Sequence, residues 1–119
     1  MSGRQEIERA IALYIEAINT DNVAIIPFAE EAVMCGPMLP EPVRGESAVR
    51  QYVAETAPFI ARMKLNTTVI EDDAAALFVE FEGLNGVVIE GALLLRFEGA
   101  LICYGQFFFD TRLLFKGAQ

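Results

Sequence analysis

The strongest constraint on the fold lies in the second half of the sequence, where four apolar stretches are separated by short turns. These stretches are residues 64–71, 74–82, 86–98 and 101–112. Asn85 and Gly86 both tolerate positive φ, so this dipeptide predicts a tight hairpin. Asp72-Asp73 and Glu98-Gly99-Ala100 predict the other two turns. Strands joined by such short turns pair with their neighbours, so this half predicts an antiparallel meander.

The first half predicts three helices, over residues 4–19, 23–30 and from Glu46 to about residue 60. In the first of these, the apolar residues at helical spacing are Ile7, Ile11, Tyr14, Ile15 and Ile18. Pro27 bends or shortens the second helix, and Tyr52 lies on the buried face of the third. A short strand is expected at 32–35, before the irregular stretch GPMLPEPVRG. Helices on one face of a meander predict an α+β fold.

Length and charge narrow the class of protein. A chain of 119 residues predicts one domain over 1–119. The net charge of −8 argues against binding to nucleic acid or to an anionic membrane, because the chain lacks the excess of Lys and Arg that would neutralise phosphate groups. No apolar run reaches the ~20 residues that a membrane span needs. The amino-terminal stretch MSGRQEIERA is polar, unlike a secretory signal, so a cytoplasmic location is expected.

The absence of histidine removes several kinds of site. A Ser-His-Asp triad and any His-containing metal site need that residue. Cys35 and Cys103 lie far apart in the sequence, and two thiolates alone do not make a zinc site. They are interpreted as reduced, buried small hydrophobic side chains. No metal and no cofactor are therefore expected.

The last two strands are apolar on both faces. In the final one, strict alternation gives one set of side chains comprising Ile102, Tyr104, Gln106, Phe108 and Asp110. The other set comprises Cys103, Gly105, Phe107 and Phe109. An antiparallel strand with one wet face alternates more cleanly than this. Both faces are therefore expected to be covered, one by the helices and the other by a second copy of the sheet in a homodimer.

The order of elements resembles the NTF2-like superfamily, and within it the SnoaL-like proteins related to polyketide cyclases and ketosteroid isomerases. The stretches that carry the resemblance are YIEAINTDNVAIIPFAEEAVMCGP, VRGESAVRQYV and FFFDTRLL. The resemblance covers nearly the whole chain. It implies a cone in which a curved antiparallel sheet wraps around three helices of the amino-terminal half, leaving an apolar pocket. It also implies dimerisation through the outer face of the sheet.

The resemblance can be compared residue by residue with ketosteroid isomerases, whose buried protonated carboxyl group is a known example in enzymology. Tyr14 matches the tyrosine of their oxyanion hole. The position of the base falls on Cys35-Gly36, and that of the oxyanion acid falls near Leu95. Two of the three catalytic groups are missing, so the ketosteroid isomerase mechanism is not expected.

The SnoaL-like pattern implies a catalytic role for Asp110, which follows the aromatic run at the end of the last strand. In the characterised cyclases the matching Asp is an acid/base, but they also use a histidine that this chain lacks. Tyr14 is either a core residue or a donor to a developing enolate oxygen. Asp110 is either a solvated partner of Arg112 or a carboxylate whose pKa is raised among aromatic rings.

The remaining predicted ligand-binding residues are Tyr104, Gln106, Phe108, Leu95, Met34 and Tyr52. The first three lie on the alternation set of Asp110, which faces either the cavity or the partner subunit. Two functions remain open. One is a binder of a small apolar molecule that works as a cofactor-independent isomerase, cyclase or hydratase on a carbonyl-containing substrate. The other is a non-catalytic homodimer that binds a ligand or a protein.

Overall fold

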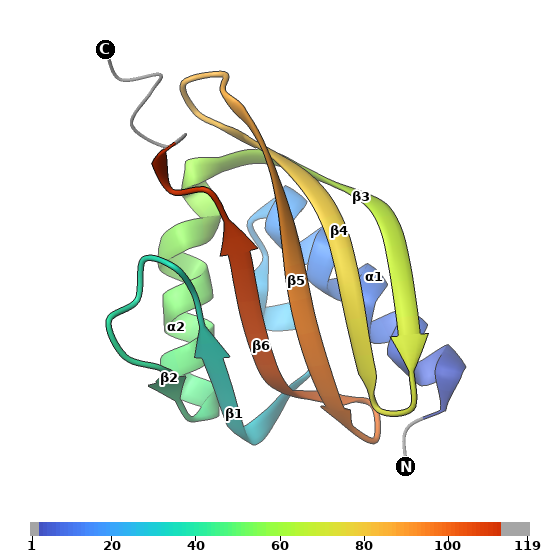
Figure 1. The fold of residues 1–119 in the computed structure, drawn as a ribbon. Helices are drawn as coiled ribbons and strands as arrows, with labels where there is room; N and C mark the ends of the chain where they lie inside the picture. Colours follow the sequence, from blue (N-terminus) through green and yellow to red (C-terminus); the bar gives the residue numbers. More distant parts are fainter. Residues whose placement is uncertain (1–2, 113–119) are drawn as a thin grey trace.

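Six strands form one curved sheet in the order β2-β1-β6-β5-β4-β3 (Figure 1). The structure is a computed structural model, and it describes residues 3–112. The strands are β1 (Phe28–Cys35), β2 (Val43–Arg44), β3 (Ile60–Glu71), β4 (Ala74–Gly83), β5 (Val88–Glu98) and β6 (Leu101–Phe109). Strands β3 to β6 pair in sequence order and antiparallel, which confirms the predicted meander. β1 pairs with β6 in parallel, so the first strand of the chain lies beside the last.

The part of the chain that the structure describes has two α-helices, not three. They are α1 (Arg4–Thr20) and α2 (Glu46–Thr56), and two short 3-10 turns, η1 (Val23–Ile25) and η2 (Ala57–Phe59), accompany them. The helix expected over 23–30 is therefore wrong. Pro27 forces the preceding residue out of the helical region, and Ile26 is extended at φ −71° and ψ 126°. The carbonyl of Pro27 then accepts a bond from the Ile102 N–H at 2.7 Å, so the chain leads directly into β1.

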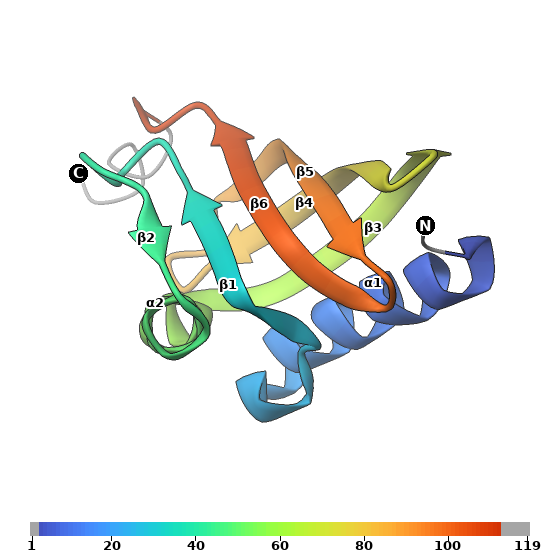
Figure 2. The same ribbon diagram turned by 90° about the horizontal axis from the view of Figure 1, so that it is seen from below.

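The helices cover the concave face of the sheet, as Figure 2 shows from below. α1 packs on β3 and α2 on β1. Three isoleucines of α1 and the inward-facing leucines of the central strands are fully or almost fully buried between the layers, among them Ile7, Leu77, Leu93 and Leu95. Asn19 fixes the end of α1 to β3, because its side-chain amide bonds both the N–H and the C=O of Met63, at 2.7 and 2.9 Å.

A β-bulge at the start of β6 decides which side chains face the helices. Arg96 of β5 pairs with Tyr104, but Phe97 pairs with Ile102, so Cys103 is the extra residue. Ile102 is buried against the helices, and the next residues to face that side are Gly105, Phe107 and Phe109. Strict alternation places Ile102 and Tyr104 on one face, and the bulge shows that this grouping is wrong.

The convex face of the sheet carries exposed apolar side chains. They include Phe78 and Phe108, each 47% exposed, which lie in the row formed by Phe78, Ala92 and Phe108. Glu80 and Glu90 lie opposite each other at one end of this face, and Arg96 lies toward the other end. None of the helices within residues 3–112 has the length and apolar character that crossing a membrane would require.

Candidate ligand cavity

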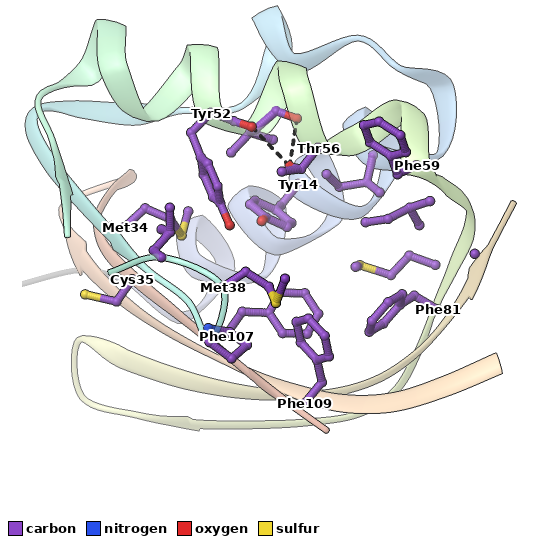
Figure 3. Close-up of a pocket in the computed structure, with 17 residues that line it drawn as sticks. Tyr14, Met34, Cys35, Met38, Tyr52, Thr56, Phe59, Phe81, Phe107 and Phe109 are labelled. Atoms are coloured by element: carbon purple, nitrogen blue, oxygen red, sulfur yellow. Dashed lines mark hydrogen bonds between the residues drawn. The ribbon is translucent and has the colours of Figure 1, made fainter. Parts of the chain in front are cut away.

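A cavity of about 250 Å³ lies between the concave face of the sheet, the two helices and the loop that follows β1. Figure 3 shows the side chains that surround it. Most of them are apolar: Ile18, Met34, Met38, Leu39, Val53, Phe59, Ile60, Met63, Phe81, Phe107 and Phe109. The remaining lining residues are Tyr14, Tyr52, Thr56, Cys35, Pro37 and Gly83. None of the lining residues within 3–112 carries a charge.

Three phenylalanines of the sheet form one wall of the cavity. Phe81, Phe107 and Phe109 meet pairwise edge to face, with ring centroids 5.2–5.4 Å apart. Such arrangements are favourable beyond the burial of area alone. Gly91 makes room for this cluster, because a Cβ at position 91 would lie 2.8 Å from a ring carbon of Phe107. The wall is therefore rigid and apolar.

Two tyrosines supply the polar atoms of the opposite wall. Tyr14 of α1 is only 4% exposed, and burial, followed by the nearby Tyr52 phenol, raises its pKa well above the usual value. Burial also raises the pKa of Tyr52, which projects from α2. Both phenols are thus protonated at neutral pH and available as donors. Figure 3 shows their oxygens turned toward the lining side chains of the sheet.

The Tyr14 hydroxyl has no hydrogen-bond partner among the residues that the structure describes. This is unusual, because buried polar groups are nearly always hydrogen-bonded. The Thr56 hydroxyl differs, since it is engaged within its own helix by the carbonyls of Tyr52 and Val53 at 3.1 and 3.2 Å. Cys35 also turns away, because its Sγ lies 3.7 Å from the Tyr104 hydroxyl on the convex side. The tyrosines are therefore the donors open to a ligand.

The mouth of the cavity is apolar and partly exposed. Met38, from the loop after β1, is 53% exposed, and Phe59, from η2, is 68% exposed. Both line the cavity. The loop is held by a turn in which the Leu39 N–H donates to the Gly36 carbonyl at 3.1 Å. A ligand can thus reach the interior by passing between these two exposed side chains.

Three of the predicted site residues line the cavity: Tyr14, Met34 and Tyr52. Leu95 does not, because it is fully buried in the core of the sheet. Tyr104, Gln106 and Phe108 do not line it either, since the bulge turns them to the convex face. There the Tyr104 hydroxyl donates to Gln106 Oε1 at 2.8 Å. Sequence alternation left this choice of face open, and the structure decides for the convex one.

Asp110 is also placed away from the cavity. β6 ends at Phe109, and the Asp110 carboxylate accepts hydrogen bonds from the Arg112 guanidinium at 2.7 to 3.2 Å and from the Arg112 N–H at 3.0 Å. Its side chain is 39% exposed. The structure therefore does not bring Asp110 and Tyr14 together at one enclosed point, which corrects the expected catalytic pair.

The aromatic lining residues that sequence reasoning missed are Phe81, Phe107, Phe109 and Phe59. The first three share a signal, since each lies on a strand face with buried neighbours. Phe107 and Phe109 follow Gly105, which is buried, at two-residue spacing. Phe59 gave no periodic signal, because it lies in the short turn η2 beside Pro58.

A group of three or more His, Cys, Asp or Glu side chains suited to a metal ion is absent from residues 3–112. Cys35 lines the cavity, but its thiol turns to the convex side, and no carboxylate of residues 3–112 lies on the wall. The described part of the cavity wall can therefore bind apolar surface and donate hydrogen bonds, but it offers no charged side chain for proton transfer.

No protein-family model matches the sequence, and no curated protein matches it either. Solved structures do match. A putative SnoaL-like polyketide cyclase from Jannaschia sp. CCS1 aligns with a TM-score of 0.82 at 9% identity, over 95% of this chain and 91% of that one. An NTF2-like protein of unknown function from Cytophaga hutchinsonii aligns with a TM-score of 0.77 at 20% identity, over 92% and 95%.

A third structure is a hypothetical protein with a ketosteroid isomerase-like fold from Catenulispora acidiphila, in complex with trimethylamine. It aligns with a TM-score of 0.75 at 15% identity, over 92% of this chain and 88% of that one. Likeness at such low identity shows architecture and not activity. The curved sheet, the helices on its concave face and these matches together show that the chain has the NTF2-like fold, shared with SnoaL-like and ketosteroid isomerase-like proteins.

Proposed function

We propose that this protein binds a small, neutral, mainly apolar molecule whose acceptor oxygen, such as a carbonyl, accepts a hydrogen bond from Tyr14. The observation that carries the proposal is the buried Tyr14 hydroxyl, which lacks a partner within residues 3–112 and lies on the wall of an apolar cavity. Leaving such a group unsatisfied costs about 1–3 kcal/mol. A ligand oxygen that accepts this bond recovers much of that cost.

Size and charge define the ligand further. The cavity of about 250 Å³ is smaller than the ~300–1,000 Å³ typical of sites for drug-sized ligands. An anion finds no cation among the lining residues that the structure describes, and it also meets a protein with a net charge of −8. A carbonyl compound with a short apolar body satisfies both the phenol and the Phe and Met side chains.

The test compares octanone, octane and octanoate as ligands of the unaltered protein and of Tyr14→Phe, by isothermal titration calorimetry. Octanone should bind more tightly than octane and octanoate. Loss of one hydrogen bond in Tyr14→Phe should weaken octanone binding by roughly 3- to 10-fold, while octane binding stays unchanged. The matched control is Tyr104→Phe, which removes a phenol from the convex face and should leave octanone binding unaffected. Octanone binding that is equal in both proteins would contradict the role of Tyr14.

Trimethylamine provides a separate arm of this test, because it is bound by the structurally similar Catenulispora acidiphila protein. The aromatic rings of Phe81, Phe107 and Phe109 could hold a methylated ammonium by cation–π attraction. The Tyr14 phenol, which has no partner within residues 3–112, favours an acceptor oxygen instead. Tighter binding of trimethylammonium than of octanone would therefore overturn the proposed ligand chemistry.

Cofactor-independent isomerase- or lyase-type chemistry is a second candidate, favoured by the two protonated phenols on one cavity wall. Tyr14 and Tyr52 could together stabilise the oxyanion of an enolate. Because no carboxylate of residues 3–112 lines the cavity, the proton would go to a base other than Asp110. The direct measurement is exchange of the α-protons of octanone in D₂O, followed by NMR. Exchange no faster than in buffer alone would leave binding as the function.

We also propose that a second copy of the chain covers the convex face. The exposed Phe78 and Phe108 would lie in the centre of the contact. A two-fold axis across the strands would bring Arg96 of each copy toward the acidic end of the other, near Glu90. Phe108→Glu should then convert dimer to monomer in light scattering, whereas Leu84→Ser, which removes an exposed leucine from the β4–β5 hairpin, should not. A monomeric unaltered protein would contradict this proposal.

A further inference from the structure

Gly105 of β6 lies directly beneath the end of the Met34 side chain. Met34 is its pairing partner in β1, and Leu95 is its partner in β5. A Cβ at position 105 would lie 2.8 Å from Met34 Sδ, 3.0 Å from Met34 Cε and 3.4 Å from Leu95 Cδ2. Contacts under 3.0 Å essentially do not occur for real Cβ atoms. The thioether therefore lies flat on the strand only because position 105 has no side chain.

The direction in which Met34 would move follows from its surroundings. Leu95, on the far side of Gly105, is fully buried, so the core offers no space there. Met34 is 3% exposed, and the empty volume next to it is the cavity that it lines. The atoms that a Cβ would meet are the flexible end of a methionine, which can rotate away without a shift of the backbone. A small side chain at 105 would thus fill part of the cavity with Met34.

We propose that Gly105 is a specificity-determining position, because its missing side chain sets the depth of the cavity and so the longest apolar ligand that fits. Gly105 is not itself among the lining residues, and it acts through Met34. This inference rests on the proposed function. Gly91 is not equivalent, since a Cβ there would also meet the backbone oxygen of Phe108 at 2.9 Å and would strain the sheet.

The experiment measures the affinity of straight-chain methyl ketones, from pentanone to decanone, for the whole protein. Each added methylene that is buried should tighten binding by about fourfold until the cavity is full. In Gly105→Ala this gain should stop at a shorter ketone than in the unaltered protein. Met34→Ala should extend the gain to a longer ketone, because it removes the side chain that limits the depth.

The decisive variant is the double substitution Gly105→Ala with Met34→Ala. The new methyl group conflicts chiefly with Met34, so the double variant should bind long ketones as well as Met34→Ala does. The matched control combines Gly105→Ala with Met63→Ala. Met63 is a second methionine of the cavity wall, 2% exposed, and it is not among the atoms nearest to position 105. Because Met34 is still present in this control, the gain in affinity should still stop at a shorter ketone than in Met34→Ala.

A second readout does not depend on ligand. With ¹³C-methyl methionine, the Met34 signal should move strongly in Gly105→Ala and the Met38 signal should not. An unmoved Met34 signal, or an unchanged ketone length limit in Gly105→Ala, would overturn the role of Gly105. If no ketone binds even the unaltered protein, the proposed function itself fails. A failure confined to the variants refutes only the inference about Gly105.

Discussion

Replacing Asn19 by Ala should destabilise the protein by removing the clamp between α1 and β3. Two hydrogen bonds are lost, from Asn19 Oδ1 to the Met63 N–H at 2.7 Å and from Asn19 Nδ2 to the Met63 C=O at 2.9 Å. At about 0.5–1.5 kcal/mol net for each bond, the sum is about 1–3 kcal/mol. Alanine has a better helix propensity than asparagine by up to about 0.7 kcal/mol, which offsets part of this loss. The residue is exposed, so water also replaces some of the lost partners.

The free energy of unfolding should therefore fall by about 1–2 kcal/mol, measured by urea denaturation with circular dichroism. The matched control is Thr20→Ala, at the next position of α1. Its hydroxyl bonds only the Glu16 carbonyl in the same helix, at 2.8 Å, so the change should stay within about 0.5 kcal/mol. Equal stability of Asn19→Ala and the unaltered protein would refute the reasoning that this side chain joins helix to sheet.

Three further predictions concern single side chains. Because burial raises the pKa of Tyr14, its contribution to stability is complete below the usual phenol pKa of about 10 and is lost as the pH rises through the higher folded value. The loss of stability above about pH 10 should thus be shallower in Tyr14→Phe, and equal slopes in urea titrations would contradict this. Asp110→Asn should leave octanone affinity unchanged in calorimetry, since the carboxylate pairs with Arg112 outside the cavity. A loss of affinity of tenfold or more would contradict this placement of Asp110. Leu95→Ala should cost about 2–5 kcal/mol in urea denaturation, because the side chain is fully buried, while Leu101→Ala, at a position 43% exposed, should cost much less.

The sequence predicted the elements that depend on local pattern. The turns at Asn85-Gly86 and Glu98-Gly99-Ala100 fix the meander, and the isoleucine spacing fixes α1. Resemblance in the order of elements led to the NTF2-like fold, which the structural matches support at low identity. The prediction of a short second helix was wrong because Pro27 disfavours the helical conformation at Ile26, the residue before it. This steric effect outweighs the tendency of the apolar run to form a helix.

The face of β6 could not be predicted, for a physical reason. Its side chains are apolar on both faces, so a one-residue bulge at Cys103 leaves no trace in the alternation of polar and apolar residues. That single extra residue changes which side chains of β6 line the cavity. Phe107 and Phe109 face the helices, and Gln106 and Phe108 face outward. Tyr14, Met34 and Tyr52 were found because helical spacing and a buried strand position do not depend on the bulge.

The most direct test of the account is a crystal structure of the protein grown with octanone. The account predicts that the ketone lies in the cavity, with its oxygen about 2.5–3.0 Å from the Tyr14 hydroxyl and its chain against Phe107 and Phe109. An empty cavity at saturating octanone, or a ketone whose oxygen points away from Tyr14, would contradict the central claim.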